Sequence, residues 1–424
     1  RGSMMFEKYD AYKDSGVEWL GQLPENWDLL PNKHIFKLKK NLVGKRSKEY
    51  ELLSLTLNGV IKRDMENPEG KFPAEFDTYQ EVKSGDFIFC HFDVEETPRT
   101  VGLSRFDGMI TGAYTVYKVN AEKFCPEFLY YFYLNLDTGK RLKPLYKGLR
   151  NTIGKDIFGE FKTFIPNYSE QVKISNFLDQ KVTEIDQAIA IKKQQIALLN
   201  ERKQIVIQKA VTQGLDPNVP MKDSGVEWIG QIPEHWEIIR SKFLFTQRKE
   251  NSRKDDVQLS ATQAYGVIPQ EEYEKRTGKS VVKISLHLDK RKRVHLNDFV
   301  ISMRSFQGGL ERAWAEGCIR SSYVVLKPLK PIDPDYYGYL FKTPMYIKAL
   351  QNTSNFIRDG QDLNFGNFSQ VDLFIVPLSE QKQIVEYIKS QLGDFEKHLE
   401  LLNQQIEKLK EYKTTLINDA VTGK

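Results

Sequence analysis

Two long stretches of the chain, residues 169–212 and 379–422, place apolar residues at alternating steps of three and four. This spacing lines the residues up on one side of an α-helix and predicts that this side packs on a partner helix, as in a coiled coil. Neither stretch contains proline, and each opens with Ser-Glu-Gln, where we expect the serine hydroxyl to cap the helix start. The predicted helix-pairing seam consists of Leu178, Val182, Ile185, Ile189, Ile196, Leu199 and Val206 in the first stretch and of Ile388, Leu392, Phe395, Leu399, Leu402, Ile406, Leu409 and Leu416 in the second, with Lys192, Lys203 and Lys413 on the same lines.

The two stretches are copies of each other, because they align without a gap at an offset of 210 residues. This duplication favours pairing of one seam with the other. An amphipathic helix lying on a globular core is the alternative, since it would also carry an apolar stripe. At 1.5 Å per residue, a helix of about 44 residues is roughly 66 Å long, so the predicted pair forms a rod.

A second repeat precedes each half of the chain. Residues 13–30 read KDSGVEWLGQLPENWDLL, and residues 222–239 read KDSGVEWIGQIPEHWEII. In each copy two tryptophans eight residues apart bracket a glycine and a proline, which predict a turn. We interpret each copy as a strap whose tryptophans anchor a globular domain to the rod. A base-stacking role would require exposed tryptophans.

The segments between strap and long helix resemble each other loosely and predict two mixed α/β globules. Each contains short apolar runs of period two broken by glycine and aspartate, which is typical of antiparallel strands and hairpins. A helix that starts with proline follows in both segments. The matching pairs are residues 51–64 with 257–272, 82–90 with 294–302, 102–114 with 309–323, and the helices 126–136 with 334–341.

These elements predict an α+β protein with the order strap, globule, long helix, repeated once. The second globule follows the first helix directly and precedes the second helix directly, so the two helices must run antiparallel, with internal pseudo-two-fold symmetry and one globule at each end. The predicted domains are residues 4–168, with the strap 13–30, the helix 169–213, residues 214–378, with the strap 222–239, and the helix 379–424.

The distribution of charge points to a polyanion as the partner. The chain has a net charge of +5, but residues 31–150 carry +4 and residues 240–358 carry +10, while the remainder is acidic. Two separate basic blocks are typical of a protein that contacts DNA at two places. An uneven but solvated surface would give the same pattern by chance.

Candidate DNA contacts are basic and amide side chains on predicted loops, because lysine and arginine bind phosphates and arginine, asparagine and glutamine read base edges. The loops SMRSFQGGL and GLRNTIGKD combine such residues with glycine. The run 290–293 is better suited to phosphates than to bases. The candidates are Lys45, Arg46, Lys62, Arg63, Arg99, Arg105, Arg150 and Asn151 in the first globule, and Arg253, Lys254, Lys290, Arg291, Lys292, Arg293, Arg304, Gln307, Arg312, Asn355 and Arg358 in the second.

The sequence predicts no catalytic site. It contains no adjacent prolines, as a methyltransferase motif would require, and neither a GxGxxG nor a GxxxxGK[ST] loop. Glu-x-Lys occurs at Glu81, Glu160, Glu201 and Glu411, among other positions, but two of these four lie on the predicted helices, so a hidden nuclease is disfavoured. Three scattered cysteines provide neither a disulfide framework nor a metal site, and no apolar run is long enough to span a membrane. We expect a cytoplasmic protein.

The chain resembles the specificity subunit of Type I restriction–modification enzymes. The likeness rests on SGVEWLGQLPENW and SGVEWIGQIPEHW, and on FIPNYSEQ and FIVPLSEQ at the helix starts, and it covers essentially the whole chain. It implies that each globule is a target recognition domain for one half of a split, asymmetric DNA site. It also implies that the helices set the spacing and bind two methyltransferase subunits, to which restriction subunits add.

By the same resemblance this chain has no cofactor, and S-adenosylmethionine, ATP and Mg belong to the partner subunits. Two alternatives remain open. One is the same role in a related system with a fused nuclease and methyltransferase. The other is a coiled-coil scaffold that joins two protein-binding modules. The globules match no recognition domain of assignable target, so the DNA sequence is not predicted.

Overall fold

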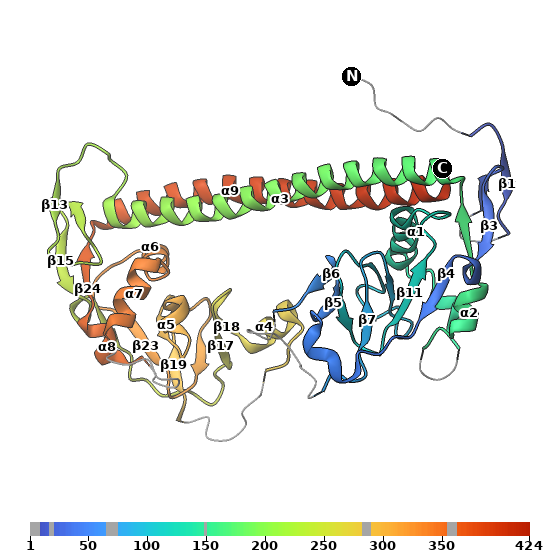
Figure 1. The fold of residues 1–424 in the computed structure, drawn as a ribbon. Helices are drawn as coiled ribbons and strands as arrows, with labels where there is room; N and C mark the ends of the chain where they lie inside the picture. The colour runs from blue at the N-terminus through green and yellow to red at the C-terminus, as the bar shows by residue number, and fades with distance from the viewer. Residues whose placement is uncertain (1–8, 17–20, 65–74, 148–150, 282–289, 354–362) are drawn as a thin grey trace. The chain divides into compact units, whose positions relative to one another are not determined.

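The structure, a computed structural model, describes residues 9–16, 21–64, 75–147, 151–281, 290–353 and 363–424. The chain forms two compact units, which we describe separately (Figure 1). Unit 1 contains residues 1–192 and 403–424, and unit 2 contains residues 193–402. Each unit combines a mixed α/β globule with a segment of two paired helices, which confirms the predicted α+β class.

The globule of unit 1 is built from short antiparallel strands and two helices. They are β1 (Tyr12–Asp14), β2 (Gln22–Pro24), β3 (Asp28–Pro31), β4 (Phe36–Lys39), β5 (Leu53–Thr56), β6 (Gly59–Lys62), β7 (Gln80–Val82), β8 (Phe87–Phe89), β9 (Val101–Leu103), β10 (Gly108–Ile110), β11 (Thr115–Val119), β12 (Lys162–Ile165), α1 (Pro126–Thr138) and α2 (Lys155–Glu160). The central sheet has the order β4-β11-β8-β9. The strap forms the β1–β2 hairpin, and β3 pairs with β12.

The globule of unit 2 repeats this plan with additional helices. Its elements are β13 (Met221–Asp223), β14 (Gln231–Pro233), β15 (Glu237–Arg240), β16 (Phe245–Gln247), β17 (Leu259–Thr262), β18 (Gly266–Pro269), β19 (Lys292–Val294), β20 (Phe299–Ile301), β21 (Glu311–Arg312), β22 (Gly317–Ile319), β23 (Val324–Pro328), β24 (Asp372–Ile375), α4 (Gln270–Thr277), α5 (Ser305–Gly308), α6 (Pro334–Leu340), α7 (Pro344–Asn352) and α8 (Phe365–Gln370). The central sheet has the order β16-β23-β20-β21, and β15 pairs with β24 as β3 does with β12.

The two long helices are α3 (Tyr168–Gln213) and α9 (Leu378–Thr422). In unit 1 they run antiparallel, because Asp186 on α3 binds Lys413 while Lys192, further along α3, binds Gln405 at a lower number on α9. In unit 2 three apolar residues of α3 (Ile207, Ala210 and Val211) and three of α9 (Ile384, Val385 and Ile388) belong to one buried cluster. Of the predicted seam, Leu178, Ile185, Ile189, Ile388, Phe395 and Ile406 are buried, and Val182, Ile196, Leu199, Val206, Leu392, Leu399, Leu402, Leu409 and Leu416 are half-buried.

The cap of α3 differs from the prediction. The side chain of Asn167, not that of Ser169, accepts the backbone N–H of Glu170 at 3.0 Å. The helix starts one residue earlier than the Ser-Glu-Gln motif, so Asn167 holds the capping position. At the start of α9 the equivalent residue is Pro377, whose side chain has no acceptor, and only its carbonyl takes part, accepting the N–H of Gln381.

One tryptophan of each strap is completely buried, as an anchor requires. The Trp27 indole donates to Glu170 of α3 at 3.2 Å, and the Trp236 indole donates to Glu380 of α9 at 3.1 Å. The second strap tryptophan of unit 2, Trp228, is half-buried, and Trp19 of unit 1 lies outside the described residues. The glutamates of the two Ser-Glu-Gln motifs therefore serve as acceptors for the strap.

A buried glutamine in the same motif fixes each globule to its helix. In unit 1 Gln171 donates to the Pro166 carbonyl and accepts the backbone N–H of Cys125, both at 2.8 Å. In unit 2 Gln381 donates to the carbonyl that follows β24 and accepts the backbone N–H of Asp333, again at 2.8 Å. Cys125 and Asp333 directly precede α1 and α6, so in each unit one amide ties the start of this helix and the end of the last strand to the long helix.

Candidate nucleic-acid interface

In unit 1 the exposed candidate cations lie on turns beside aromatic rings. Lys62 ends β6, and its Nζ is 5.7 Å from the centre of the Phe106 ring in the β9–β10 turn, next to the exposed Arg105. Arg46, which follows the exposed Lys45, lies 5.7 Å from the ring of its neighbour Tyr50. An aromatic face orients a cation without neutralising it. These side chains therefore keep their charge for a polyanion.

Arg99, in contrast, braces the interior of unit 1. Its guanidinium pairs with the buried Asp137 of α1 at 3.4 Å and donates to the carbonyl of Leu57 at the tip of the β5–β6 hairpin. The Arg99 side chain is therefore held by contacts within the globule. Of the remaining candidates, Asn151 is exposed, Arg63 is half-buried, and Arg150 lies outside the described residues.

In unit 2 the loop SMRSFQGGL presents two exposed candidates, Arg304 and Gln307, on and beside the short helix α5. The amide of Gln263, in the β17–β18 turn, donates to the Arg304 carbonyl at 3.4 Å. Gln263 was not predicted, although an amide in a hairpin turn is a usable signal. Arg253, Lys254 and Lys290 are exposed as well, while Asn355 and Arg358 lie outside the described residues.

The basic run 290–293, which we expected to suit phosphates better than bases, is mostly internal. Arg293 is 8% exposed, and its guanidinium is 2.6 Å from a carboxylate oxygen of Asp256. Lys292 donates to the Tyr323 carbonyl, and burial lowers its pKa. Alternation along β19 turns these side chains to opposite faces, and both faces are covered. Arg291 is 5% exposed and is considered below.

Arg312 is also committed to internal contacts. Its guanidinium forms an ion pair with Asp335 of α6, donates twice to the Asn297 side chain, and stacks 4.2 Å from the Trp314 ring centre. The pKa of Asp335 is lowered, because hydrogen bonds and charge from Lys389 and Arg312 outweigh its burial. Trp314, which is 53% exposed, was missed by the sequence reasoning. Trp314 is not part of a periodic pattern of apolar residues, so the sequence alone did not single it out.

The strand register shows that the two globules carry different side chains at equivalent positions. In unit 1 β7 pairs with β10 and places Gln80 opposite Ile110, whereas in unit 2 β19 pairs with β22 and places Lys292 opposite Ile319. Gln80 donates to the Tyr114 carbonyl as Lys292 does to that of Tyr323. The next positions therefore correspond too, and Glu81 of unit 1 stands where unit 2 has Arg293.

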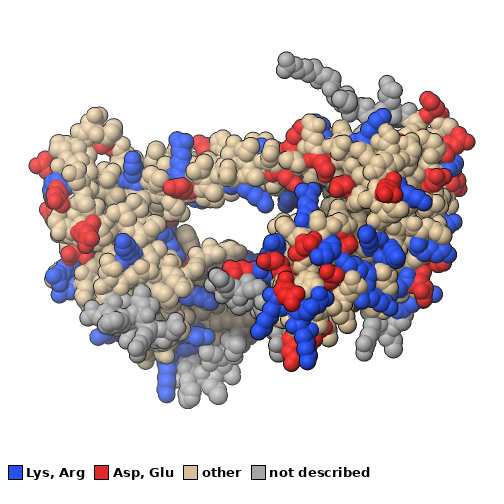
Figure 2. Space-filling model, in the orientation of Figure 1, with Lys and Arg blue, Asp and Glu red and all other residues tan. Residues whose placement is uncertain are grey.

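The surface charge of unit 1 is mixed. Figure 2 shows lysine and arginine side chains interspersed with aspartate and glutamate over the visible face of its globule, on the right of the view. Some of these charges pair, as Lys143 does with Glu95 and Lys83 with Asp107. The visible face of this unit therefore carries charges of both signs and no continuous basic field.

The Glu81–Lys83 pair and the neighbouring Cys90 and His91 lie in ordinary structural surroundings. Lys83 forms ion pairs with both Glu81 and Asp107 at the surface. Burial raises the pKa of Cys90 and lowers that of His91 to about 4, so both are neutral core groups. Within the described ranges no three His, Cys, Asp or Glu side chains are grouped so as to hold a metal, and no helix there is long and apolar enough to cross a membrane.

Comparison with known proteins finds similarity over part of the sequence. Residues 233–411 match the sequence model of the Type I restriction modification DNA specificity domain. The Type I restriction enzyme MjaVIII specificity subunit of Methanocaldococcus jannaschii is 30% identical over 129 residues, which are 30% of this chain and 29% of that protein. The chain thus aligns with less than a third of the length of this curated relative.

Two solved structures share the fold over nearly the whole chain. One belongs to work on the structural basis of complex assembly and conformational transition of the type I R-M system. It is 14% identical, covers 95% of this chain and 99% of its own, and has a TM-score of 0.62. The HsdS subunit from Thermoanaerobacter tengcongensis is also 14% identical, with coverages of 97% and 99% and a TM-score of 0.52. Residues 233–411 are thus similar to a Type I restriction modification DNA specificity domain, and the chain shares the fold of these two structures over nearly its whole length.

Proposed function

We propose that this chain is the DNA sequence-recognition subunit of a Type I restriction–modification enzyme. Each globule reads one half of a bipartite, asymmetric site, and the long helices set the distance between the half-sites. The chain itself performs no chemistry. Methylation and ATP-dependent cleavage, with S-adenosylmethionine, ATP and Mg, belong to methyltransferase and restriction subunits that bind to it.

The observation that carries this proposal is a conserved frame with divergent loops. The strap tryptophan, the helix-start glutamate and the bridging glutamine make the same bonds in both units. The loops differ, however: between β20 and β21 unit 2 exposes Arg304 and Gln307, whereas between the equivalent strands β8 and β9 unit 1 exposes Glu95 and Glu96. Two globules that differ in this way read different base sequences, so the whole site is asymmetric.

The helices of unit 2 carry apolar side chains that no neighbour in the chain covers. Leu198 and Ile205, seven residues apart on α3, are 64% and 47% exposed, and Leu401 on α9 is 51% exposed. Residues seven apart lie on one side of a helix, so they form a stripe suited to helices of a partner. This supports docking of the methyltransferase subunits on the long helices.

Methylome sequencing of cells that express this chain with its cognate methyltransferase tests the proposal. The expected result is one methylated motif made of two different half-sites separated by a fixed gap. Replacing residues 31–150 with the corresponding block of a relative should change one half-site and leave the other intact. If both halves change together, or if no motif is methylated, the proposal is wrong.

Partner identity and DNA binding are checked separately. Co-purification would recover separate methyltransferase and restriction subunits for a Type I enzyme, and one fused nuclease–methyltransferase chain for the related system. A filter-binding titration with salt separates both from a protein scaffold, because DNA affinity must fall steeply as the salt concentration rises.

A further inference from the structure

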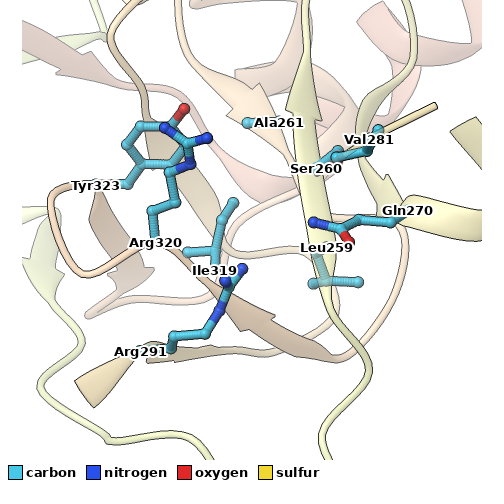
Figure 3. A pocket seen from close by; sticks show the side chains of 9 residues that line it. All are labelled: Leu259, Ser260, Ala261, Gln270, Val281, Arg291, Ile319, Arg320 and Tyr323. Carbon is cyan, nitrogen blue, oxygen red and sulfur yellow. The ribbon is translucent and has the colours of Figure 1, made fainter. Parts of the chain in front are cut away.

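The globule of unit 2 contains a small pocket with two arginines in its wall and no carboxylate. It has a volume of about 160 Å³ and lies between β17, β22 and the start of α4. Figure 3 shows Gln270 reaching in from one side, Arg291 rising from below, and Arg320 and Tyr323 on the side opposite Gln270. The lining is completed by Ser260 and apolar side chains, so its formal charge is positive.

Arg291 is a buried cation without a counter-charge. It is 5% exposed, and its Nε has no hydrogen-bond partner. Its side-chain neighbour is the Cys318 thiol, whose pKa is raised by burial, so this group is neutral and offers no compensation. Among the described residues no carboxylate forms an ion pair with Arg291 or Arg320. A buried charge is costly unless an opposite charge meets it.

A second pocket of the same globule shows that the excess charge is particular to the first. That pocket has a volume of about 420 Å³ and is also lined by cations, but acids accompany them. Arg312 pairs with Asp335 there, and Lys342 pairs with Glu311 at 2.6 Å. The cations of this second pocket are thus neutralised by acids, whereas no acid lines the Arg291 pocket.

We propose that the pocket of Arg291 and Arg320 binds a phosphate group of the DNA backbone. The cavity is smaller than the roughly 300 Å³ that drug-sized ligands occupy, which suits a single phosphate and excludes a nucleoside. Arginine guanidinium groups match phosphate oxygens in pairs. Lys292 acts as a positioning residue, since its bond to the Tyr323 carbonyl holds the loop that carries Arg320. This inference rests on the proposed function and adds to it the site of a backbone contact.

The contact belongs to the second globule alone. By the strand register, Lys292 and Ile319 of unit 2 correspond to Gln80 and Ile110 of unit 1. Arg291, which precedes Lys292, therefore corresponds to Tyr79, and Arg320, which follows Ile319, corresponds to Thr111. Neither residue of unit 1 is a cation. Binding of the half-site of the second globule therefore has a phosphate clamp that the first lacks, in keeping with the larger positive charge of residues 240–358.

The test compares Arg320→Gln and Arg291→Gln with Arg276→Gln in the full chain. Arg276 is the matched control, because it is an exposed arginine of the same globule whose charge is paired with Glu272. Fluorescence anisotropy with mixed-sequence duplexes is recorded between about 50 and 200 mM salt. Hydrogen exchange of β17 and β22 shows whether each variant is folded. If Arg291→Gln does not fold, Arg320→Gln still tests the proposal, because Arg320 is exposed.

We expect each of the two pocket variants to weaken DNA binding roughly tenfold, whatever the DNA sequence. The slope of log affinity against log salt concentration should decrease in magnitude by about one more than it does in the control variant. Inorganic phosphate should raise the thermal stability of the wild type and not that of Arg320→Gln. Pocket variants that bind DNA like Arg276→Gln overturn the assignment and leave the proposed function standing. If phosphate stabilises the wild type but the wild type binds no DNA, the phosphate group that the pocket takes does not come from DNA, and the proposed function is wrong as well.

Discussion

Removal of the bridging amide in Gln381→Leu is expected to destabilise the globule of unit 2 by a few kcal/mol. Leucine keeps the bulk of the side chain, which is 2% exposed, but removes both of its hydrogen bonds. The backbone N–H of Asp333 and the carbonyl after β24 then lose their partner. An unsatisfied buried group costs about 1–3 kcal/mol, so the two together cost about 2–6 kcal/mol, of which the gain from burying leucine returns a part.

Hydrogen exchange with mass spectrometry measures this loss locally. A change of about 3 kcal/mol corresponds to a rise of roughly a hundredfold in the exchange of the most protected amides of α6 and β24. The control is Gln383→Leu, two residues along the same helix, where the glutamine is exposed. Gln171→Leu should produce the same loss in unit 1, because both of its bonds are buried. Equal exchange in Gln381→Leu and Gln383→Leu would refute the reasoning.

Three further predictions follow from the core and from the helices. His91 is buried with no hydrogen-bond partner on either ring nitrogen, and burial, followed by the charge of Lys155, lowers its pKa from 6.5 to about 4. The unfolded chain therefore takes up a proton before the folded one as the pH falls, so the histidine should remove about 3 kcal/mol of stability between pH 6.5 and pH 4. His91→Phe should abolish this part of the pH dependence in urea titrations, and an unchanged dependence would contradict it. Deletion of one heptad from both long helices shortens them by about 10 Å and should contract the spacer of the methylated site by a few base pairs, or abolish binding to the original site. An unchanged spacer with full affinity would show that the length of the helices does not set the distance between the half-sites. Residues 4–214 alone should form a dimer, visible by light scattering, that directs methylation to a palindrome, since Asp186 would meet Lys203 of the second copy in place of Lys413. A monomer at micromolar concentration, or methylation of the parental asymmetric site, would contradict this expectation.

The sequence by itself determined the elements whose signal is local or repeated. A stripe at steps of three and four is sufficient to predict a long helix, because one helix face must be covered whatever covers it. The copies at offsets of 209 and 210 residues predicted two similar globules and straps, and the structure has both. Short alternating runs such as residues 51–64 predicted the β5–β6 hairpin for the same reason.

Only the tertiary structure decided which charged side chains are available to DNA. Arg293 and Arg312 are of a residue type that commonly contacts DNA. In the folded chain they form ion pairs with Asp256 and Asp335, which are distant in the sequence. Arg320 carried no local signal, but the strand pairing brings it to a pocket with Arg291. The physical reason is that the effect of a charge depends on its burial and its neighbours, and these are set by residues that the fold brings together from far apart in the chain.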